Sequence, residues 1–408
     1  MNKTVKIFIG VIVGLIVVIA LLSIGGGNKK IEQTTCYKKA IIVWSPLESR
    51  KIRTQEIVKS LKKYCLTLNV QKKTLEQIKD AVLSEIASGK GPDVIFVDSD
   101  FLLKNKNIFA SQSGKKWFNL KDYPNSIQKD FGEKTIAYPL TYDTLVLFWN
   151  KDLLNSIGYT QPPESFEGLL EIIPKLRKMD LSGQIILSPI ALGSSQNINS
   201  SFETFLAMMK MLNPDTKKTS GDISKALYKT LDFYTQFTSS KSEYFSWHPN
   251  LSNQRDAFLS EQTAMIVDFY SFKNEIKKRN PRFNFEIAPF LQFESNPKKT
   301  NYIEPYFFAV TKKSSEIGWL FLEIFDSRYD EIAKDLELNP IKINTGKNAE
   351  GVGKILFNEM IVGDNFSEIN KDYIKPYIKE DIENWLSNQR DIKQLINSKQ
   401  ASKFYNKK

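Results

Sequence analysis

Three polar side chains follow a short apolar run near residue 95. Residues 94–97 (Val-Ile-Phe-Val) predict a buried strand, and Asp98, Ser99 and Asp100 come directly after it. In open α/β sheets, ligands bind beyond the carboxyl ends of the strands. Carboxylates at that position can accept hydrogen bonds from a polar ligand. The three residues are therefore candidate ligand-binding groups.

The same acids also allow a hydrolytic interpretation. Asp98 and a second acid, Asp143, could serve as the acid and base of a glycan hydrolase, a reaction that needs two carboxyl groups about 5 to 9.5 Å apart. The sequence supplies no such distance, and no other feature of it is typical of bond cleavage. Asp98 and Asp100 could equally cap the segment that follows or face solvent. Binding is the favoured interpretation, and no enzymatic activity is expected.

Histidine and cysteine chemistry is nearly excluded by composition. The chain has one histidine, His248, and two cysteines, Cys36 and Cys65. The usual zinc ligand sets cannot be assembled from them, and a Ser-His-Asp triad could form only around that one imidazole. Residues 351–354 (Gly-Val-Gly-Lys) lack the spacing of a phosphate-binding loop. We expect neither a metal nor a cofactor.

The net charge is basic but dispersed. Lys and Arg number 57 against 46 Asp and Glu, which gives a formal charge of +11. The densest basic runs, residues 277–279 and 298–299, are short, and elsewhere lysines are mixed with acids. A solvated lysine-rich surface explains this pattern better than a polyanion-binding face. No nucleic-acid partner is predicted.

An apolar segment near the N-terminus predicts a membrane anchor. Residues 7–24 have Ser23 as their only polar side chain and are flanked by lysines. A spanning helix needs about 20 apolar residues, whereas a cleavable signal has about 7 to 15 followed by an A-x-A-like site, which this chain lacks. We expect residues 1–27 to be an uncleaved anchor and glycine linker, with cleavage as the alternative. The chain after Tyr37 would then lie outside the cytoplasm, held at the cell membrane by a single span.

An exterior location allows the two cysteines to be joined. Cys36 precedes a strand-like run at 40–44 and Cys65 precedes another at 66–70, with a helical pattern between them. If these runs are parallel strands joined by one crossover, both cysteines lie at the same end of the sheet. A disulfide is favoured, and a pair of small buried thiols is the alternative.

The main body of the chain alternates between strand-like apolar runs and helical periodicity. This alternation predicts an α/β fold with parallel strands. Residues 136–149 form an apolar stretch with a polar centre, longer than the usual strand of about 5 to 6 residues. We predict two strand halves there, joined by a crossing between domains. Farther on, Ser165 can cap the helix that follows Pro162 and Pro163.

Several segments, taken in order, resemble the extracellular solute-binding proteins of ABC importers, the family similar to maltose-binding protein. The resemblance spans residues 37–399, and its order and spacing are more specific than any single motif. The matching segments are 87–96 (ASGKGPDVIF), 136–139 (IAYP) with 142–145 (YDTL), 149–154 (WNKDLL) with Pro162 and Pro163, 257–259 (AFL) with Ala264 and Met265, and Ala309 and Val310 with 312–314 (KKS).

The resemblance implies a two-lobed α/β fold of the periplasmic-binding-protein type II, in which hinge strands cross between the lobes three times. Crossings are expected near 140–144, 302–308 and 349–354. Lobe 1 would comprise 37–140 and 308–349, and lobe 2 would comprise 144–301 and 354–400. A carbohydrate or similar polar solute would bind between lobes that close as a hinge, for delivery to an ABC permease. A sensory or scaffold domain without a permease is the alternative.

The resemblance also suggests ligand-binding residues. Asp143 falls where a sugar-binding relative uses an acid, and Phe269 and Tyr270 lie near the position of an aromatic platform that would cover the apolar face of a sugar ring. Several of these aromatic residues could equally be core. The full expected set is Trp44, Ser45, Glu48, Asp98, Ser99, Asp100, Tyr142, Asp143, Ser194, Ser195, Phe269, Tyr270, Glu304 and Tyr306.

Some positions depart from the family pattern. Val97 stands where the closest sugar binders have an aromatic residue, and Pro46 and Ser49 replace a polar residue and a lysine of the first loop. Residues 304–307 are bulkier than is common in the family. These differences argue against a maltose-like ligand.

Overall fold

The computed structural model describes residues 35–112, 118–131, 135–212, 220–296 and 298–387. The predicted anchor and glycine linker lie outside these ranges. Within them, no helix is both long enough and apolar enough to cross a membrane.

The first strands form as the sequence predicts. Strands β1 (Lys39–Ser45) and β2 (Leu66–Lys72) pair in parallel and are connected through α3 (Gln55–Lys62). Lys39 lies opposite Leu66 in this register, so the segments before the two strands meet at one end of the sheet. There Cys36 and Cys65 are joined in a disulfide, with Cα atoms 5.0 Å apart.

Two long strands connect the lobes. Strand β4 (Ala137–Asn150) pairs with β9 (Asn301–Val310) through its first half and with β7 and β8 through its second half. The prediction of two strand halves at 136–149 is wrong: the strand is continuous, with a register shift between Pro139 and Thr141. It continues because β9 pairs with it across the polar centre, so the backbone groups there keep their hydrogen-bond partners.

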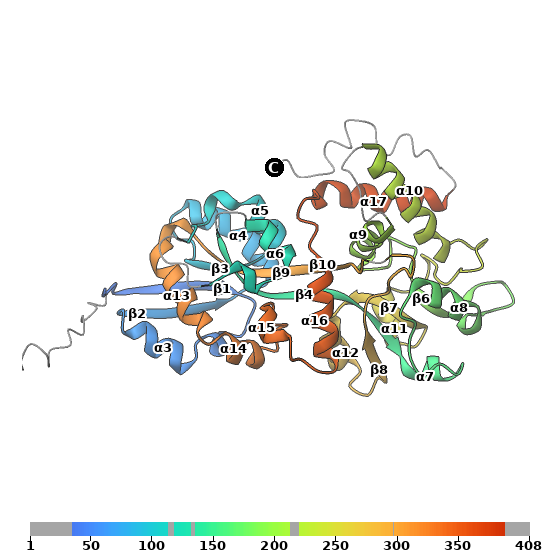
Figure 1. Cartoon of the computed structure of the whole chain (residues 1–408), viewed down its shortest axis with the longest axis horizontal. Helices are drawn as coiled ribbons and strands as arrows, with labels where there is room; N and C mark the ends of the chain where they lie inside the picture. The colour runs from blue at the N-terminus through green and yellow to red at the C-terminus, as the bar shows by residue number, and fades with distance from the viewer. Residues whose placement is uncertain (1–34, 113–117, 132–134, 213–219, 297, 388–408) are drawn as a thin grey trace, which may run out of the picture.

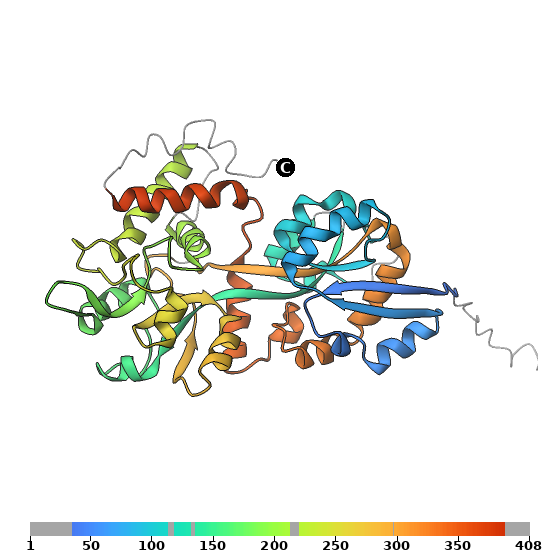
Figure 2. The same cartoon turned by 180° about the vertical axis from the view of Figure 1, so that it is seen from behind.

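These crossing strands make one mixed sheet of the whole molecule. Its order is β2-β1-β3-β9-β4-β7-β6-β5, with β10 beside β9 and β8 beside β4. β4 and β9 run antiparallel at the centre, and Figures 1 and 2 show them passing between the two lobes. The remaining strands are β3 (Val94–Asp98), β5 (Lys178–Met179), β6 (Ile185–Ala191), β7 (Thr263–Phe269), β8 (Phe285–Ala288) and β10 (Gly363–Asp364).

Helices cover both lobes, with the N-terminal elements and α13 in the first lobe and the middle of the chain and α17 in the second (Figure 1). Ser165 caps α8 by accepting a hydrogen bond from Gly168 N at 3.0 Å, as predicted. The first lobe has α2 (Ser49–Ile52), α3, α4 (Leu75–Ala87), α5 (Ser99–Lys104), α6 (Asn125–Phe131), α13 (Ser315–Asp326), α14 (Tyr329–Asp335) and α15 (Ile343–Gly346). The second has α7 (Lys151–Asn155), α8 (Phe166–Leu176), α9 (Ser201–Leu212), α10 (Ser220–Tyr234), α11 (Gln254–Leu259), α12 (Phe272–Arg279) and α17 (Lys371–Leu386).

The third connection between the lobes is a turn and a helix. Helix α16 (Val352–Val362) contacts β4, β8 and β9, and β10 then returns beside β9. The crossing expected near 349–354 therefore falls at the start of α16, where Gly351 takes a positive φ of 53°. A side chain there would be strained, which suits glycine.

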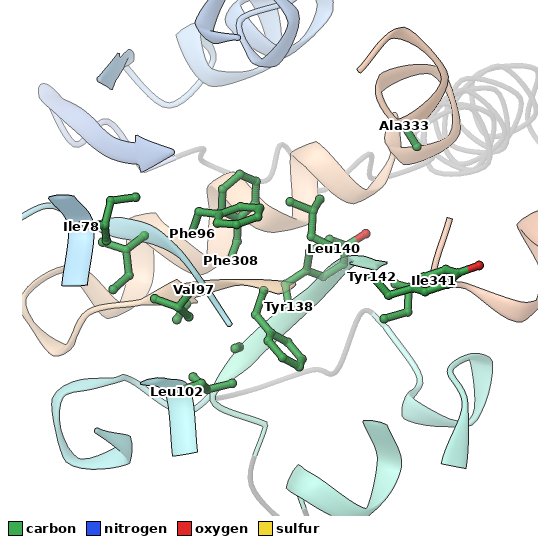
Figure 3. Close-up of a cluster of buried hydrophobic side chains, with 14 of the residues drawn as sticks. Ile78, Phe96, Val97, Leu102, Tyr138, Leu140, Tyr142, Phe308, Ala333 and Ile341 are labelled. Carbon is green, nitrogen blue, oxygen red and sulfur yellow. The ribbon is translucent and has the colours of Figure 1, made fainter. Parts of the chain in front are cut away.

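The apolar core follows the sheet. A larger cluster covers β1, β3 and β9 and continues along β4 into the second lobe, while a second cluster packs α8, α9, α10 and α17 against the second lobe's strands. In the larger cluster, Phe96 and Phe308 meet edge to face with ring centroids 6.1 Å apart (Figure 3). Because this core runs along β4, it fixes the crossing strand on which candidate ligand groups lie.

Candidate functional site

Two acids lie side by side on the crossing strands. Asp143 of β4 and Glu304 of β9 are register partners in the antiparallel pair, so their side chains project from the same face of the sheet. Asp143 Oδ1 accepts hydrogen bonds from the backbone N of Thr144 at 2.9 Å and of Ser271 at 3.2 Å. Burial raises the pKa of Asp143 to about 6, although a hydrogen bond from the Ser271 side chain and the two backbone hydrogen bonds oppose the shift.

Glu304 is the centre of a wider set of contacts. Its carboxylate accepts hydrogen bonds from the hydroxyls of Ser99 at 3.3 Å and Tyr302 at 2.8 Å. Lys371 Nζ lies 3.7 Å from Glu304 Oε2. Burial raises the pKa of Glu304 to about 7; the charge of Lys371 opposes the shift and that of Asp100 adds to it.

Lys371 brings the second lobe to this acid. It is the first residue of α17, its side chain is only 5% exposed, and its Nζ lies 3.1 Å from Asp100 Oδ1 and 2.8 Å from the Tyr302 hydroxyl. Burial disfavours its charge, but Glu304 and Asp100 outweigh burial and raise its pKa. A buried cation at a helix N-terminus also opposes the helix dipole. Its position is therefore set by the acids it contacts.

These contacts define the interlobe cluster. It joins α5, β9 and α17, which belong to different lobes and to a crossing strand, and Asp143 of β4 borders it. Its members in direct contact are Ser99, Asp100, Tyr302, Glu304 and Lys371, and Asp98 is included because its charge acts on Glu304 and Lys371.

Both carboxylate oxygens of Asp98 already have partners within the protein. Its Oδ1 accepts a hydrogen bond from Phe101 N at 2.9 Å and so caps α5, while Oδ2 forms an ion pair with Lys79. The helix-capping alternative for Asp98 is thus confirmed.

The residues after the first strand are not brought into the cluster. Trp44 is buried in the larger core, with Lys73 Nζ 4.5 Å from the centre of its ring. Ser45 is buried and accepts a hydrogen bond from Leu47 N. Glu48 is partly exposed and pairs with Arg50 at 3.0 Å, and this contact lowers its pKa. The structure places all three in local contacts of the first lobe.

Ser194 and Ser195 are held inside the second lobe. Ser194 O accepts a hydrogen bond from the Tyr234 hydroxyl at 3.2 Å, and its Oγ accepts one from Gln196 N. Ser195 Oγ donates to Glu383 Oε1 at 2.6 Å. These hydroxyls have structural partners there, so their expected contact with a ligand stays a prediction.

The aromatic candidates pack mainly against protein. Phe269 meets Tyr302 edge to face with ring centroids 5.9 Å apart, and Tyr306 stacks on Phe96 at 5.2 Å. The Tyr142 hydroxyl donates to Leu356 O of α16 at 2.8 Å. Tyr270 is buried, with its ring 4.0 Å from Lys273 Nζ. Phe269, which stays partly exposed, and Tyr270 thus each have a contact within the protein, and their expected role as a platform for a sugar ring stays a prediction.

Three residues of this region were missed by the sequence analysis. They are Lys371, Tyr302 and Glu203, whose side chain pairs with Lys375 at 2.8 Å and contributes to raising the pKa of the buried Tyr302. Tyr302 lies within the predicted second crossing and could have been found from its strand alternation with Glu304. Lys371 and Glu203 lie on helices far away in sequence and carried no local signal.

Among the residues that the structure describes, no group of three or more His, Cys, Asp or Glu side chains could hold a metal ion. The acids of the interlobe cluster are instead spaced by lysines and hydroxyls. The arrangement can exchange hydrogen bonds with a polar solute.

Solved structures show the same fold at low sequence identity. The sugar-binding protein MalE from Xanthomonas citri is 16% identical with a TM-score of 0.65, covering 87% of this chain and 94% of that one. The GacH receptor of Streptomyces glaucescens, solved unliganded and with acarbose, is 14% identical with a TM-score of 0.63, covering 90% and 96%. An ABC transporter solute-binding protein from Thermotoga lettingae, bound with α-D-tagatose, is 16% identical with a TM-score of 0.61, covering 89% and 97%.

Sequence comparison places the chain in a family. No curated protein sequence matches it. The family model of bacterial extracellular solute-binding proteins matches residues 66–324, which is more than half of the chain. The matched range includes both crossing strands and most of both lobes. The chain therefore belongs to the family of bacterial extracellular solute-binding proteins, as the order of its sequence segments indicated.

Proposed function

We propose that this protein is a membrane-anchored extracellular receptor that captures a carbohydrate or a similar polar solute between its lobes and delivers it to an ABC permease. Family membership supports solute capture outside the cytoplasm. The structurally similar proteins include receptors solved with acarbose, tagatose and maltotetraose, which favours a carbohydrate over a free ion.

The observation that carries the proposal is the pairing of Asp143 with Glu304 on the strands that cross between the lobes. Carboxylates accept charge-assisted hydrogen bonds, which are the contacts that sugar hydroxyls can donate. Lys371 of the second lobe and Asp100 of the first reach the same place. A solute bound there contacts both lobes and stabilises their closed arrangement.

Other features support the proposed location outside the cytoplasm and the proposed delivery of the solute to a permease. The Cys36–Cys65 disulfide suits an oxidising compartment, and the apolar residues 7–24 would hold the chain at the membrane. A receptor of this kind passes its solute to a permease because closure changes the surface that the permease contacts. A sensory role would use the same binding site, and genes for permease subunits beside this one would favour delivery.

Thermal unfolding of the full-length protein with a panel of sugars, oligosaccharides and polyols tests the binding proposal. A solute that binds only the folded state stabilises it by RT ln(1 + [L]/Kd), about 2.7 kcal/mol at a hundredfold excess over Kd. We expect at least one saccharide to raise the melting temperature. If none does, while amino acids or inorganic ions do, the carbohydrate proposal is wrong.

The anchor is tested separately by fractionating cells that express the full-length chain. We expect the protein in the membrane fraction after an alkaline wash, and a variant with residues 7–24 replaced by a cleavable signal in the soluble fraction. Release of the unmodified chain by the wash alone would contradict anchoring and leave the binding proposal intact.

A further inference from the structure

We propose that the solute bound between the lobes carries a positive charge, as an amino sugar does, and that Asp143 and Glu203 are the groups that select it. This inference rests on the proposed function and narrows its substrate class. It is drawn from the balance of acids and bases around the crossing strands, from Asp143, which forms no ion pair within the described part of the chain, and from Glu203, one of whose buried oxygens has no hydrogen-bond partner there.

Acids outnumber bases around the interlobe cluster although the chain as a whole carries +11. Each lysine in this region is already paired: Lys79 with Asp98, Lys371 with Asp100 and Glu304, and Lys375 with Glu203. The five carboxyl groups of Asp98, Asp100, Asp143, Glu203 and Glu304 thus face three ammonium groups, an excess of two acids. Because burial raises the pKa of Glu304 to about 7 and that of Asp143 to about 6, the negative charge of these acids is greatest above neutral pH. The overall basic surface does not extend into this site.

Asp143 contributes one of these unbalanced charges. It is 8% exposed, and within the described part of the chain no lysine or arginine nitrogen forms an ion pair with it. The nearby Arg255 is held by Asp268, with Nε 2.7 Å from Oδ2 and Nη2 2.8 Å from Oδ1. That pair is neutral in sum and leaves Asp143 without a cation of its own.

Glu203 supplies a second observation that points to a ligand. It is 9% exposed, and its Oε1 pairs with Lys375, but its buried Oε2 has no hydrogen-bond partner among the described residues. Leaving a buried charged acceptor unsatisfied costs more than a typical hydrogen bond returns. Burial and the charge of Glu304 raise the pKa of Tyr302, and the charge of Glu203 adds to this effect. Glu203 therefore lies near a member of the interlobe cluster.

The cluster already holds one ammonium group, that of the chain itself. Lys371 Nζ is surrounded by oxygens of Asp100, Glu304 and Tyr302 and lies 5.1 Å from the centre of the Tyr302 ring. Carboxylates together with an aromatic face are the groups that bind ammonium ions in proteins. Among the described residues, the carboxylate of Asp143 has no ion-pair partner, and Glu203, although paired with Lys375, keeps one buried oxygen without a hydrogen-bond partner.

Burial makes the charge of the solute decisive. A neutral sugar that displaced water from Asp143 would increase the desolvation of an acid whose pKa burial has already raised to about 6. An ammonium group would compensate the same desolvation with its charge. Cationic and neutral sugars of the same shape should therefore differ in affinity.

Calorimetric titration of the full-length protein with matched sugars tests this difference. The probes are glucose, N-acetylglucosamine and glucosamine, followed by cellobiose, diacetylchitobiose and the glucosamine disaccharide, which share one β-1,4-linked backbone. We expect an amino sugar to bind at least about tenfold more tightly than its neutral counterparts, because a charged hydrogen bond contributes about 1.5–3 kcal/mol. Equal or weaker binding of the amino sugars would overturn the charge inference and leave the sugar receptor standing. Failure of every saccharide, neutral or cationic, would overturn both.

Two variants test whether the preference for the amino sugar depends on the charge of Asp143 itself or only on the net charge of the protein. Asp143→Asn keeps an oxygen for the Thr144 and Ser271 backbone donors but removes the charge, so the preference for the amino sugar should fall about tenfold. Glu286→Gln removes one charge from a half-exposed residue paired with Lys151 in the second lobe, and the preference should be unchanged. An equal loss in both variants, or an unchanged preference in Asp143→Asn, would contradict the assignment.

Discussion

Lys371 Nζ lies 3.1 Å from Asp100 Oδ1, and this ion pair joins α17 of the second lobe to α5 of the first. Two further ion pairs lie nearby. Lys104 of α5 pairs with Asp372 of α17, and Lys129 Nζ of α6 lies 2.6 Å from Asp364 Oδ1 of β10. The two lobes are thus held by charges on one side of the crossing strands as well as by the strands themselves.

Asp100→Asn should loosen this connection. The change removes the charge of the nearer of two acids that contact a buried lysine, and Asp100 is 29% exposed, so we expect a loss of about 1–3 kcal/mol in the free energy of unfolding. Small-angle scattering should show a larger radius of gyration than in the unchanged protein. An unchanged radius at both low and high salt would mean that the strands alone set the lobe arrangement.

Glu304→Gln should weaken solute binding. The substitution keeps one oxygen acceptor but removes the charge that Ser99, Tyr302 and Lys371 surround. Loss of one charged hydrogen bond corresponds to about tenfold or more in affinity for the best saccharide of the panel. Glu331→Gln, at an exposed position on α14, is the matched control and should leave the affinity unchanged. Similar affinities of both variants would remove Glu304 from the binding site.

Reduction of the Cys36–Cys65 disulfide should destabilise the first lobe. The bond closes a segment of 29 residues, for which chain entropy predicts about 3–4 kcal/mol. Urea unfolding of the Cys36→Ser/Cys65→Ser variant should show a lower midpoint than the oxidised protein. Adding a reductant should lower the midpoint of the unchanged protein but not that of the variant. Equal midpoints under oxidising conditions would contradict the prediction.

Asp381 should make stability fall as pH rises. Burial, and then the charge of Glu380, raise its pKa from 3.8 to about 7. The folded state therefore keeps a proton that the unfolded state loses, so this contribution to stability is largest below pH 4 and is lost up to about pH 7. Asp381→Asn cannot ionise, and we expect it to gain about 1–3 kcal/mol at pH 8 and little at pH 4. Chemical unfolding at both pH values checks this, and an equal effect at both would disprove the ionisation argument.

Gly363 allows the chain to return closely beside β9. A Cβ atom at this position would lie 2.3 Å from Ile303 Cγ2 and 2.9 Å from Glu359 O. Gly363→Ala should therefore cost about 1–3 kcal/mol, measured by urea unfolding. Gly353→Ala, inside α16 where the nearest atom is Ala349 Cβ at 3.1 Å, should stay within about 1 kcal/mol of the unchanged protein because alanine favours the helix. A smaller cost at Gly363 than at Gly353 would refute the close approach.

Local pattern was sufficient for the regular elements and for some site residues. The alternation of strands and helices, the parallel pairing of β1 with β2 and the cap at Ser165 were all readable from spacing. Asp143 could be placed at a crossing because its apolar stretch has a polar centre, whereas the crossing that carries Glu304 was implied by the family resemblance. The platform expected at Phe269 and Tyr270 stays a prediction: the Phe269 ring packs edge to face against Tyr302, and Tyr270 is buried beside Lys273.

The sequence by itself determined the family, the α/β layers and the crossing strands that carry Asp143 and Glu304, because hydrophobic periodicity and segment order are local properties. Only the tertiary structure decided that Lys371 and Glu203 stand near those acids and that Asp98 is held by Lys79. These contacts join residues that are far apart in the chain. The docking of α17 sets the contacts of Lys371 and Lys375, and the packing of α4 beside β3 sets that of Lys79 with Asp98, and no short segment encodes either.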